Sequence, residues 1–287
     1  MSASVPAPAA QELDDAFFEA AVAAAGVEGL RGRQALTGLR GSSTSLLLAG
    51  LYGRREGQWL VVAPGLEEAE GISDDLETWG VAPVHYLPEL EVLPFDRKSP
   101  TRELLAGVQA GLDRLERGEA GFYVTTLYGL RHKIMSAKTL QAHRLELVKG
   151  ATVDTEELPA RLAALGYRPG GLVEAPGDMA LRGGLIDVYS PSFDLPLRLE
   201  FFGDELESIR TFDPTDQRSR EELERAWIIP AGPLVMDDDG LLEALARVES
   251  MEDFSPDDRT HLLERLQDRL HFSGCLLYTS PSPRDRT

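Results

Sequence analysis

The residues most suggestive of chemistry lie in a short loop rich in glycine and serine that precedes a predicted helix. A phosphate-binding loop has the pattern G-x-x-x-x-G-K-[S/T], in which backbone N–H groups and the lysine hold the phosphates of a nucleotide. Gly38 fits the first glycine, Ser45 fits the last position, and Gly41 lies between them. Ser43 stands in place of the second glycine and Thr44 in place of the lysine. A hydroxyl cannot supply the lysine's charge, so these residues indicate either a degenerate nucleotide site or, as the residues alone favour, an ordinary loop that caps a helix.

A β-hairpin is predicted over residues 197–212. Apolar and polar residues alternate as far as Phe202, and a Gly-Asp dipeptide then separates this run from a second strand-like run. A dipeptide that begins with glycine between two such runs is a strong local signal for a hairpin. The period of two places three apolar side chains on one face of the first strand, namely Leu197, Leu199 and Phe201.

The other face of this strand combines a cation with an aromatic ring. Arg198 and Phe202 lie on it together with Glu200. Arg and aromatic side chains are enriched where proteins bind one another, and an exposed phenylalanine is otherwise unfavourable on a polar face. The residues alone leave two interpretations open: a protein-binding surface, or a solvated face on which a neighbouring loop covers Phe202.

Other kinds of site are not indicated. The five histidines have no paired spacing that would suggest a metal site. Residues 237–240 (DDDG) lack the alternating ligands and the closing glutamate of a calcium loop, so a solvated acidic turn before a helix is expected. No nucleophile with a positioned base can be identified. We therefore expect no catalytic residue, no metal and no cofactor in this chain.

The composition limits the possible partners and the compartment. The formal net charge is −19, which argues against binding of nucleic acid by this chain, because contacts to phosphates need clustered Lys and Arg. The single cysteine, Cys275, favours a reducing environment, and the N-terminus lacks the basic and apolar regions of a secretory signal. No apolar run approaches the roughly 18 residues of a membrane span, so a cytoplasmic location is expected.

The pattern of predicted elements indicates two kinds of domain. Helices and strands alternate from residue 36 to residue 130, which is typical of a parallel sheet covered by helices. After residue 138, short strands separated by Gly and Pro indicate an α+β insert, and a strand at residues 226–230 is expected to return to the first domain. Helices are expected at residues 11–25, 241–248 and 256–270. The expected divisions are a tail and helix at 1–28, the α/β domain at 29–137, the insert at 138–229, the return at 230–274 and a non-native tail at 275–287.

Several stretches resemble one known family. YLPELEVLPFDRKSP, YVTTLYGL and FFGDELESIRTFDPTDQRS are similar to the UvrB-like N-terminal region of the bacterial transcription-repair coupling factors (Mfd), and the resemblance covers nearly all of residues 29–274. In that family the insert binds UvrA. The resemblance implies that Arg182, Arg198 and Phe202 form the UvrA-binding surface. It also implies that the Gly/Ser loop is the remnant of a nucleotide site, so that the fold class is α/β: a degenerate P-loop-type parallel-sheet domain with an inserted α+β UvrA-interaction domain.

The resemblance further implies what lies beyond this chain. The sequence CLLYTSPSPRD looks like a translated sequencing adapter, so we expect an N-terminal fragment of a longer protein. The whole protein would be an ATP-dependent DNA translocase, with ATP and magnesium bound by motor domains that are missing here. RNA polymerase and double-stranded DNA would bind to missing C-terminal domains, one of which would mask the UvrA surface. The alternatives are a UvrB-type ATPase, against which Thr44 argues, and a stand-alone UvrA-binding adaptor.

Overall fold

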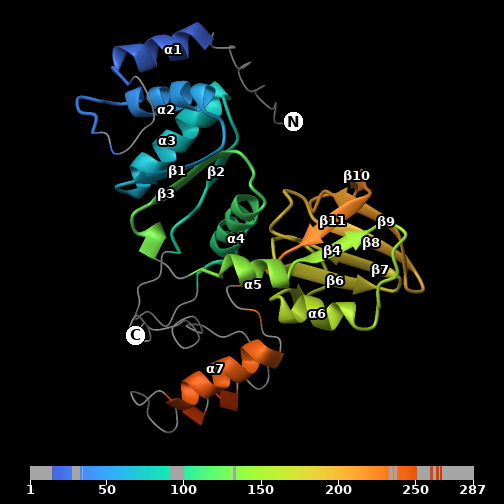
Figure 1. Cartoon of the computed structure of the whole chain (residues 1–287). Coiled ribbons are helices and arrows are strands. Elements are labelled where there is room, and N and C mark those ends of the chain that lie inside the picture. Colours follow the sequence, from blue (N-terminus) through green and yellow to red (C-terminus); the bar gives the residue numbers. More distant parts are fainter. Residues whose placement is uncertain are drawn as a thin grey trace. The chain divides into compact units, whose positions relative to one another are not determined.

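A computed structural model describes residues 15–27, 33, 35–90, 100–131, 134–232, 235, 238–250, 259–260, 263–264 and 266. The chain divides into two compact units (Figure 1). We call them the α/β unit (Met1–Glu89 and Leu115–Arg131) and the α+β unit (Leu90–Arg114 and His132–Thr287). One of the three points at which the chain passes between the units falls inside a helix, α4, whose residues up to Arg114 group with the α+β unit.

The α/β unit contains the expected parallel sheet. Its elements are α1 (Asp15–Ala24), α2 (Ser43–Arg54), β1 (Gln58–Ala63), α3 (Leu66–Trp79), β2 (Val84–Tyr86), β3 (Gly121–Thr126) and the 3-10 helix η1 (Gly129–Arg131). The strand order is β1-β3-β2, all parallel. Every residue of the central strand β3 is buried, and its Phe122 and Val124 pack with Tyr52 and Leu76 from the two helices α2 and α3.

The α+β unit is built around a larger, mostly antiparallel sheet. Its elements are α4 (Arg102–Glu116), α5 (Ala137–Ala142), β4 (Leu145–Val148), α6 (Leu158–Ala164), β5 (Arg168–Pro169), β6 (Asp178–Arg182), β7 (Leu185–Val188), β8 (Leu197–Phe202), β9 (Glu205–Phe212), β10 (Ser219–Leu223), β11 (Arg225–Ile228) and α7 (Asp238–Ser250). Six strands follow the order β10-β9-β8-β7-β6-β5, in which only the β5–β6 pair is parallel. A separate antiparallel pair, β11–β4, completes the unit.

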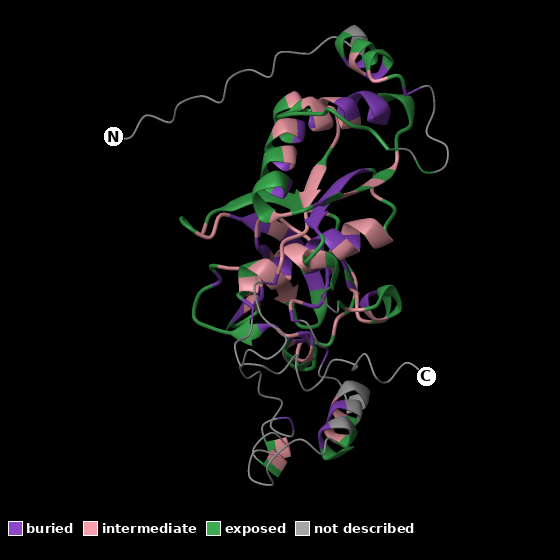
Figure 2. Ribbon diagram, turned by 90° about the vertical axis from the view of Figure 1, so that its left-hand side faces the viewer, coloured by how far each residue is buried: buried purple, intermediate pink, exposed green. Residues whose placement is uncertain are grey.

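One apolar core holds the α+β unit together. Leu158 and Leu162 of α6 pack with Leu147 of β4, with Ile228 of β11 and with the inner face of the six-stranded sheet. In Figure 2 the buried positions gather on strands and helix faces, and exposed positions dominate the loops. The buried hydroxyl of Tyr167 donates a hydrogen bond of 2.7 Å to the carbonyl oxygen of Ile229, so the end of β11 is fixed to the start of β5 by a polar contact as well.

The expected helices at residues 11–25 and 241–248 are confirmed as α1 and α7, whereas the helix at 256–270 and the tail at 275–287 lie largely or wholly outside the described residues. The expectation for residues 226–230 is wrong. This segment forms β11, and β11 pairs with β4 inside the α+β unit instead of returning to the first domain. Two short apolar strands carry no local signal for their partner, because pairing is decided by tertiary packing.

Candidate protein-binding surface

The predicted hairpin is present and has the predicted faces. Leu197 and Leu199 are fully buried in the core, and Phe201 packs partly buried against the same cluster. Gly203 begins the turn in the left-handed region (φ 62°), which explains the glycine at this position. The pairing of β8 with β9 shifts by one residue after Glu200, and such a bulge increases the local twist of the strand.

Phe202 stands at the outer end of β8 with 76% of its surface exposed. It is the most exposed of the large apolar residues in the part of the chain that the structure describes. Among the described residues no loop covers it, so the interpretation that Phe202 is buried under a neighbouring loop does not hold. An exposed ring at the end of a paired strand is held by a rigid hairpin and loses little conformational freedom on binding a partner.

Arg182 lies at the same end of the sheet as Phe202. It is the last residue of β6, where the chain turns through Gly183 (φ 60°) into β7, and it is exposed. The strand register places Arg182 opposite Leu185, and Leu185 opposite Glu200, so Arg182 shares the outer face of the sheet with Phe202. Its guanidinium donates a hydrogen bond of 2.7 Å to the carbonyl oxygen of Gly171. The structure therefore places Arg182 and Phe202 on one face, at one end, as predicted.

Arg198 differs from the prediction of a solvent-facing side chain. Only 16% of its side chain is exposed. Its Nε and Nη2 donate hydrogen bonds of 2.8 Å each to the two carboxylate oxygens of Asp187, and its Nη1 donates one of 3.2 Å to the carbonyl oxygen of Gln217. Its guanidinium carbon lies 4.5 Å from the centre of the Phe212 ring. The prediction that Arg182, Arg198 and Phe202 form one exposed patch therefore does not hold for Arg198, whose side chain is mostly buried.

The reason is that the outer face of the sheet has a small apolar cluster of its own. Val173, Ala180 and Phe212 are buried there, with Tyr189 packed against them. This cluster and the turn that follows β9 enclose Arg198, and the hydrogen bonds that Arg198 donates to Asp187 raise the pKa of the arginine above its ordinary value. The sequence contained a signal that was missed: by the alternation of their strands, Asp187 on β7 and Phe212 on β9 both lie on the outer face, and these two strands flank β8.

The turn after β9 is held by its own polar contacts. The Asp213 carboxylate accepts hydrogen bonds of 2.8 Å from the backbone N–H of Thr215 and from Arg220, and these contacts, Arg220 first, lower the pKa of Asp213. Gln217 has a φ of 60°, which is unusual for a residue with a Cβ, and the carbonyl oxygen of Gln217 is the acceptor for Arg198. The turn is therefore ordered by Asp213 on one side and by Arg198 on the other.

The Gly/Ser loop has the geometry of a helix start. Gly38 (φ 84°) and Gly41 (φ 52°) take left-handed conformations, and α2 begins at Ser43, whose Oγ accepts a hydrogen bond from the backbone N–H of Arg40. The hydroxyl of Ser42 donates a hydrogen bond of 3.1 Å to the carboxylate of Asp75. Residues 35–42, all of them described, contain no strand leading into the helix. A P-loop follows a strand, so the structure does not confirm a P-loop origin for Gly38, Gly41, Ser43, Thr44 and Ser45.

The described residues contain no group of three or more His, Cys, Asp or Glu side chains that could hold a metal ion. Within the same residues, no helix combines the length and the apolar character required to cross a bilayer.

Comparison with known proteins defines the class of the hairpin-bearing domain. Residues 145–233 match the family described as the UvrB interaction domain, so β4 to β11 form a domain of that class. The chain is also similar to transcription-repair-coupling factors: it is 34% identical over 210 residues to that of Myxococcus xanthus and 31% identical over 201 residues to that of Escherichia coli, in each case 70% of this chain and 18% of the relative. With that of Bacillus subtilis it shares 30% identity over 224 residues, 78% of this chain and 19% of the relative. The resemblance drawn from the sequence motifs is confirmed, and the chain spans about a fifth of the length of these relatives.

Proposed function

We propose that this chain recruits UvrA for nucleotide excision repair, and that it does so as the UvrA-binding part of a longer transcription-repair-coupling factor. The observation that carries the proposal is Phe202, an aromatic side chain with 76% of its surface exposed on a rigid hairpin of a UvrB interaction domain. In the whole protein, ATP and magnesium would serve a separate motor, and RNA polymerase and double-stranded DNA would bind outside this chain. The work would take place in the cytoplasm.

The chemistry of the surface specifies what its partner must offer. Phe202 needs an apolar slot, and Arg182 has a charged end that a carboxylate on the partner can reach. Glu200, next to them on the same face, accepts hydrogen bonds from Ser208 (2.5 Å) and Arg210 (3.4 Å), so its charge is already balanced within the sheet. The surface offered to UvrA is therefore an aromatic ring flanked by positive charge, on a chain whose overall charge is negative.

Replacement of Phe202 by alanine should weaken the binding of UvrA by about 2 kcal/mol or more, as expected when a central aromatic anchor is removed. Arg182→Ala should act in the same direction with a smaller effect, because Arg182 lies at the edge of the patch. Both can be measured by titrating purified UvrA against the immobilised chain. Leu60→Ala is the matched control, because Leu60 is also an exposed apolar residue but lies on β1 of the α/β unit. Equal affinity of the Phe202 variant and the wild type would refute docking on this face.

The competing proposal is a UvrB-type ATPase, and it has a direct test. We expect residues 1–274 to bind no ATP, because Thr44 brings no positive charge and the carboxylate of Asp75 lies at the start of α2, where a phosphate would have to bind. Calorimetry with Mg-ATP should give no heat of binding. A micromolar dissociation constant, about −8 kcal/mol, would favour the ATPase instead.

A further inference from the structure

The strongest unassigned feature of the α+β unit is the buried carboxylate of Asp187. Only 3% of this residue is exposed, and it faces Arg198 directly across the β7–β8 pair. Both carboxylate oxygens accept a hydrogen bond of 2.8 Å from the guanidinium. A two-point contact of this kind fixes the orientation of the planar guanidinium as well as its position.

The remaining neighbours of Arg198 make this orientation depend on Asp187. On the other side of β8, Arg198 stands opposite Arg210, which is a second positive charge. Arg210 is paired with Glu200 (3.4 Å), so Glu200 is already engaged. Like charges on directly opposite strand positions repel each other, and Asp187 is the main group that offsets this repulsion for Arg198, with a smaller contribution from the charge of Glu200.

Arg198 in turn connects three parts of the partner-facing side. It covers the ring of Phe212, holds the turn at Gln217 through a carbonyl oxygen, and precedes Phe202 by four residues on the same face of β8. The part of its side chain that stays exposed points from the same face as the ring of Phe202. A change in the seating of Arg198 would therefore change the surface offered to the partner.

We infer that Asp187 is a positioning residue of the UvrA-binding surface: it seats Arg198 so that the outer edge of the arginine and the ring of Phe202 meet the partner together. This inference rests on the proposed function and adds a residue that itself touches no partner. Its charge is the essential property, since an amide of the same shape cannot bind the guanidinium at two acceptor oxygens.

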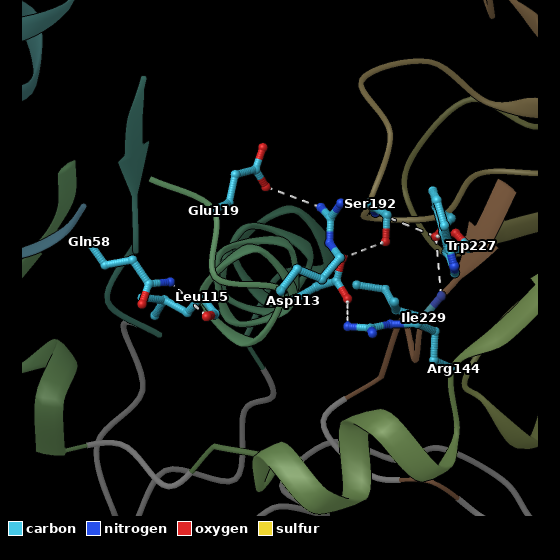
Figure 3. Close-up of polar contacts among 10 residues, drawn as sticks. Gln58, Asp113, Leu115, Glu119, Arg144, Ser192, Trp227 and Ile229 are labelled. Atoms are coloured by element: carbon cyan, nitrogen blue, oxygen red, sulfur yellow. Dashed lines mark hydrogen bonds and ion pairs between the residues drawn. The ribbon is translucent and has the colours of Figure 1, made fainter. Parts of the chain in front are cut away.

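The unit provides a matched control in a second buried carboxylate. Asp113 of α4 is 1% exposed, pairs with Arg144 and accepts a hydrogen bond of 3.4 Å from Ser192 (Figure 3). Ser192 follows β7, at the end of the sheet opposite to the turns at Gly183 and Gly203. Asp113 thus has the same chemistry as Asp187 but lies away from Arg182 and Phe202.

The test compares Asp187→Asn with Asp113→Asn by thermal melting and by titration with purified UvrA. Both variants should melt at a lower temperature than the wild type. Asp187→Asn should bind UvrA about tenfold or more weakly, as expected when one partner of a desolvated charge pair is lost near an interface, and Asp113→Asn should stay within about twofold of the wild type. In an Arg198→Ala background, Asp187→Asn should cause no further loss of binding.

Each other outcome decides against the inference. Equal loss of binding by both Asn variants would mean that Asp187 only stabilises the fold, and unchanged binding by Asp187→Asn would remove its positioning role. If Asp187→Asn does not fold, Arg198→Lys replaces it, because a lysine cannot span both oxygens of Asp187, and wild-type affinity of that variant would overturn the inference. Phe202→Ala is measured in the same series. If Phe202→Ala loses binding and Asp187→Asn keeps it, the inference about Asp187 is rejected and the proposed function stands. If Phe202→Ala keeps full binding, the proposed function itself is rejected.

Discussion

Replacement of Arg198 by alanine should lower the free energy of unfolding of the α+β unit by about 3–5 kcal/mol, the typical cost of breaking a buried ion pair from one side. The reason is what the substitution leaves behind. Asp187, which is 3% exposed in the wild type, would lose both of its arginine hydrogen bonds, and the ring of Phe212 would lose the guanidinium that lies 4.5 Å from its centre. Hydrogen exchange of the β7, β8 and β9 amides under native conditions measures this loss, because amides in a central sheet exchange through global opening.

Arg182→Ala is the control for this prediction. Arg182 also ends in a guanidinium on the outer face, but its side chain is exposed and donates a hydrogen bond to a single carbonyl oxygen, that of Gly171. Its replacement should change stability by no more than about 0.5 kcal/mol. If Arg198→Ala exchanges as slowly as the wild type, the pair with Asp187 contributes nothing to folding. A double variant, Asp187→Asn with Arg198→Met, should be more stable than Arg198→Ala alone, because it removes the buried charge as well as its partner.

The hairpin was predictable because its signals are local. A period of two assigns the inner face of β8 to Leu197 and Leu199, and a glycine at 203 marks the turn, so the faces of the strand and the position of the turn follow from adjacent residues. Whether a loop covers Phe202 was left open by the sequence, and the structure shows the ring exposed. The burial of Arg198 was not predictable in this way. The groups that enclose it come from β7, from the end of β9 and from a loop near Val173. A contact among segments so far apart in the sequence leaves no local pattern.

The same distinction explains the other differences. The strand at residues 225–228 was recognisable, but its pairing with β4 joins residues that are 77 to 83 positions apart in the sequence. Helix α4 was recognisable as well, but no local pattern shows its contacts with the α+β unit, among which Asp113 pairs with Arg144 and Gln109 donates a hydrogen bond of 3.0 Å to the carbonyl oxygen of Gly232. The Gly/Ser loop fitted half of the P-loop pattern. A strand directly before the loop would have decided between a P-loop and an ordinary helix cap, but the formation of a strand depends on its pairing partner, which the local sequence does not show.

Replacement of Leu199 by alanine should lower the free energy of unfolding of the α+β unit by about 2–5 kcal/mol through the cavity that it leaves in the core. Leu199 is fully buried and lies between Ile186 of β7 and Ile209 of β9, both buried in the same cluster. Since all three side chains are held by strand pairing, the neighbours cannot easily collapse into the space, which favours the upper part of this range. Denaturation in urea followed by hydrogen exchange of β8 provides the measurement, and the slope against urea should stay unchanged if the unit remains compact.

Phe202→Ala on the same strand separates stability from binding. Phe202 is three residues from Leu199 and faces the opposite way, with 76% of its surface exposed, so its removal should change stability by no more than about 0.5 kcal/mol. The two variants should therefore have opposite effects: Leu199→Ala should lower stability and leave the affinity of the folded fraction for UvrA unchanged, and Phe202→Ala should lower affinity and leave stability unchanged. If the Phe202 variant is unfolded and the Leu199 variant is stable, the inner and outer faces of β8 have been assigned the wrong way round. Because the alternation of the strand links all of its side chains, that result would also move Arg198 and Glu200 to the core side, and the proposed surface would be lost with them.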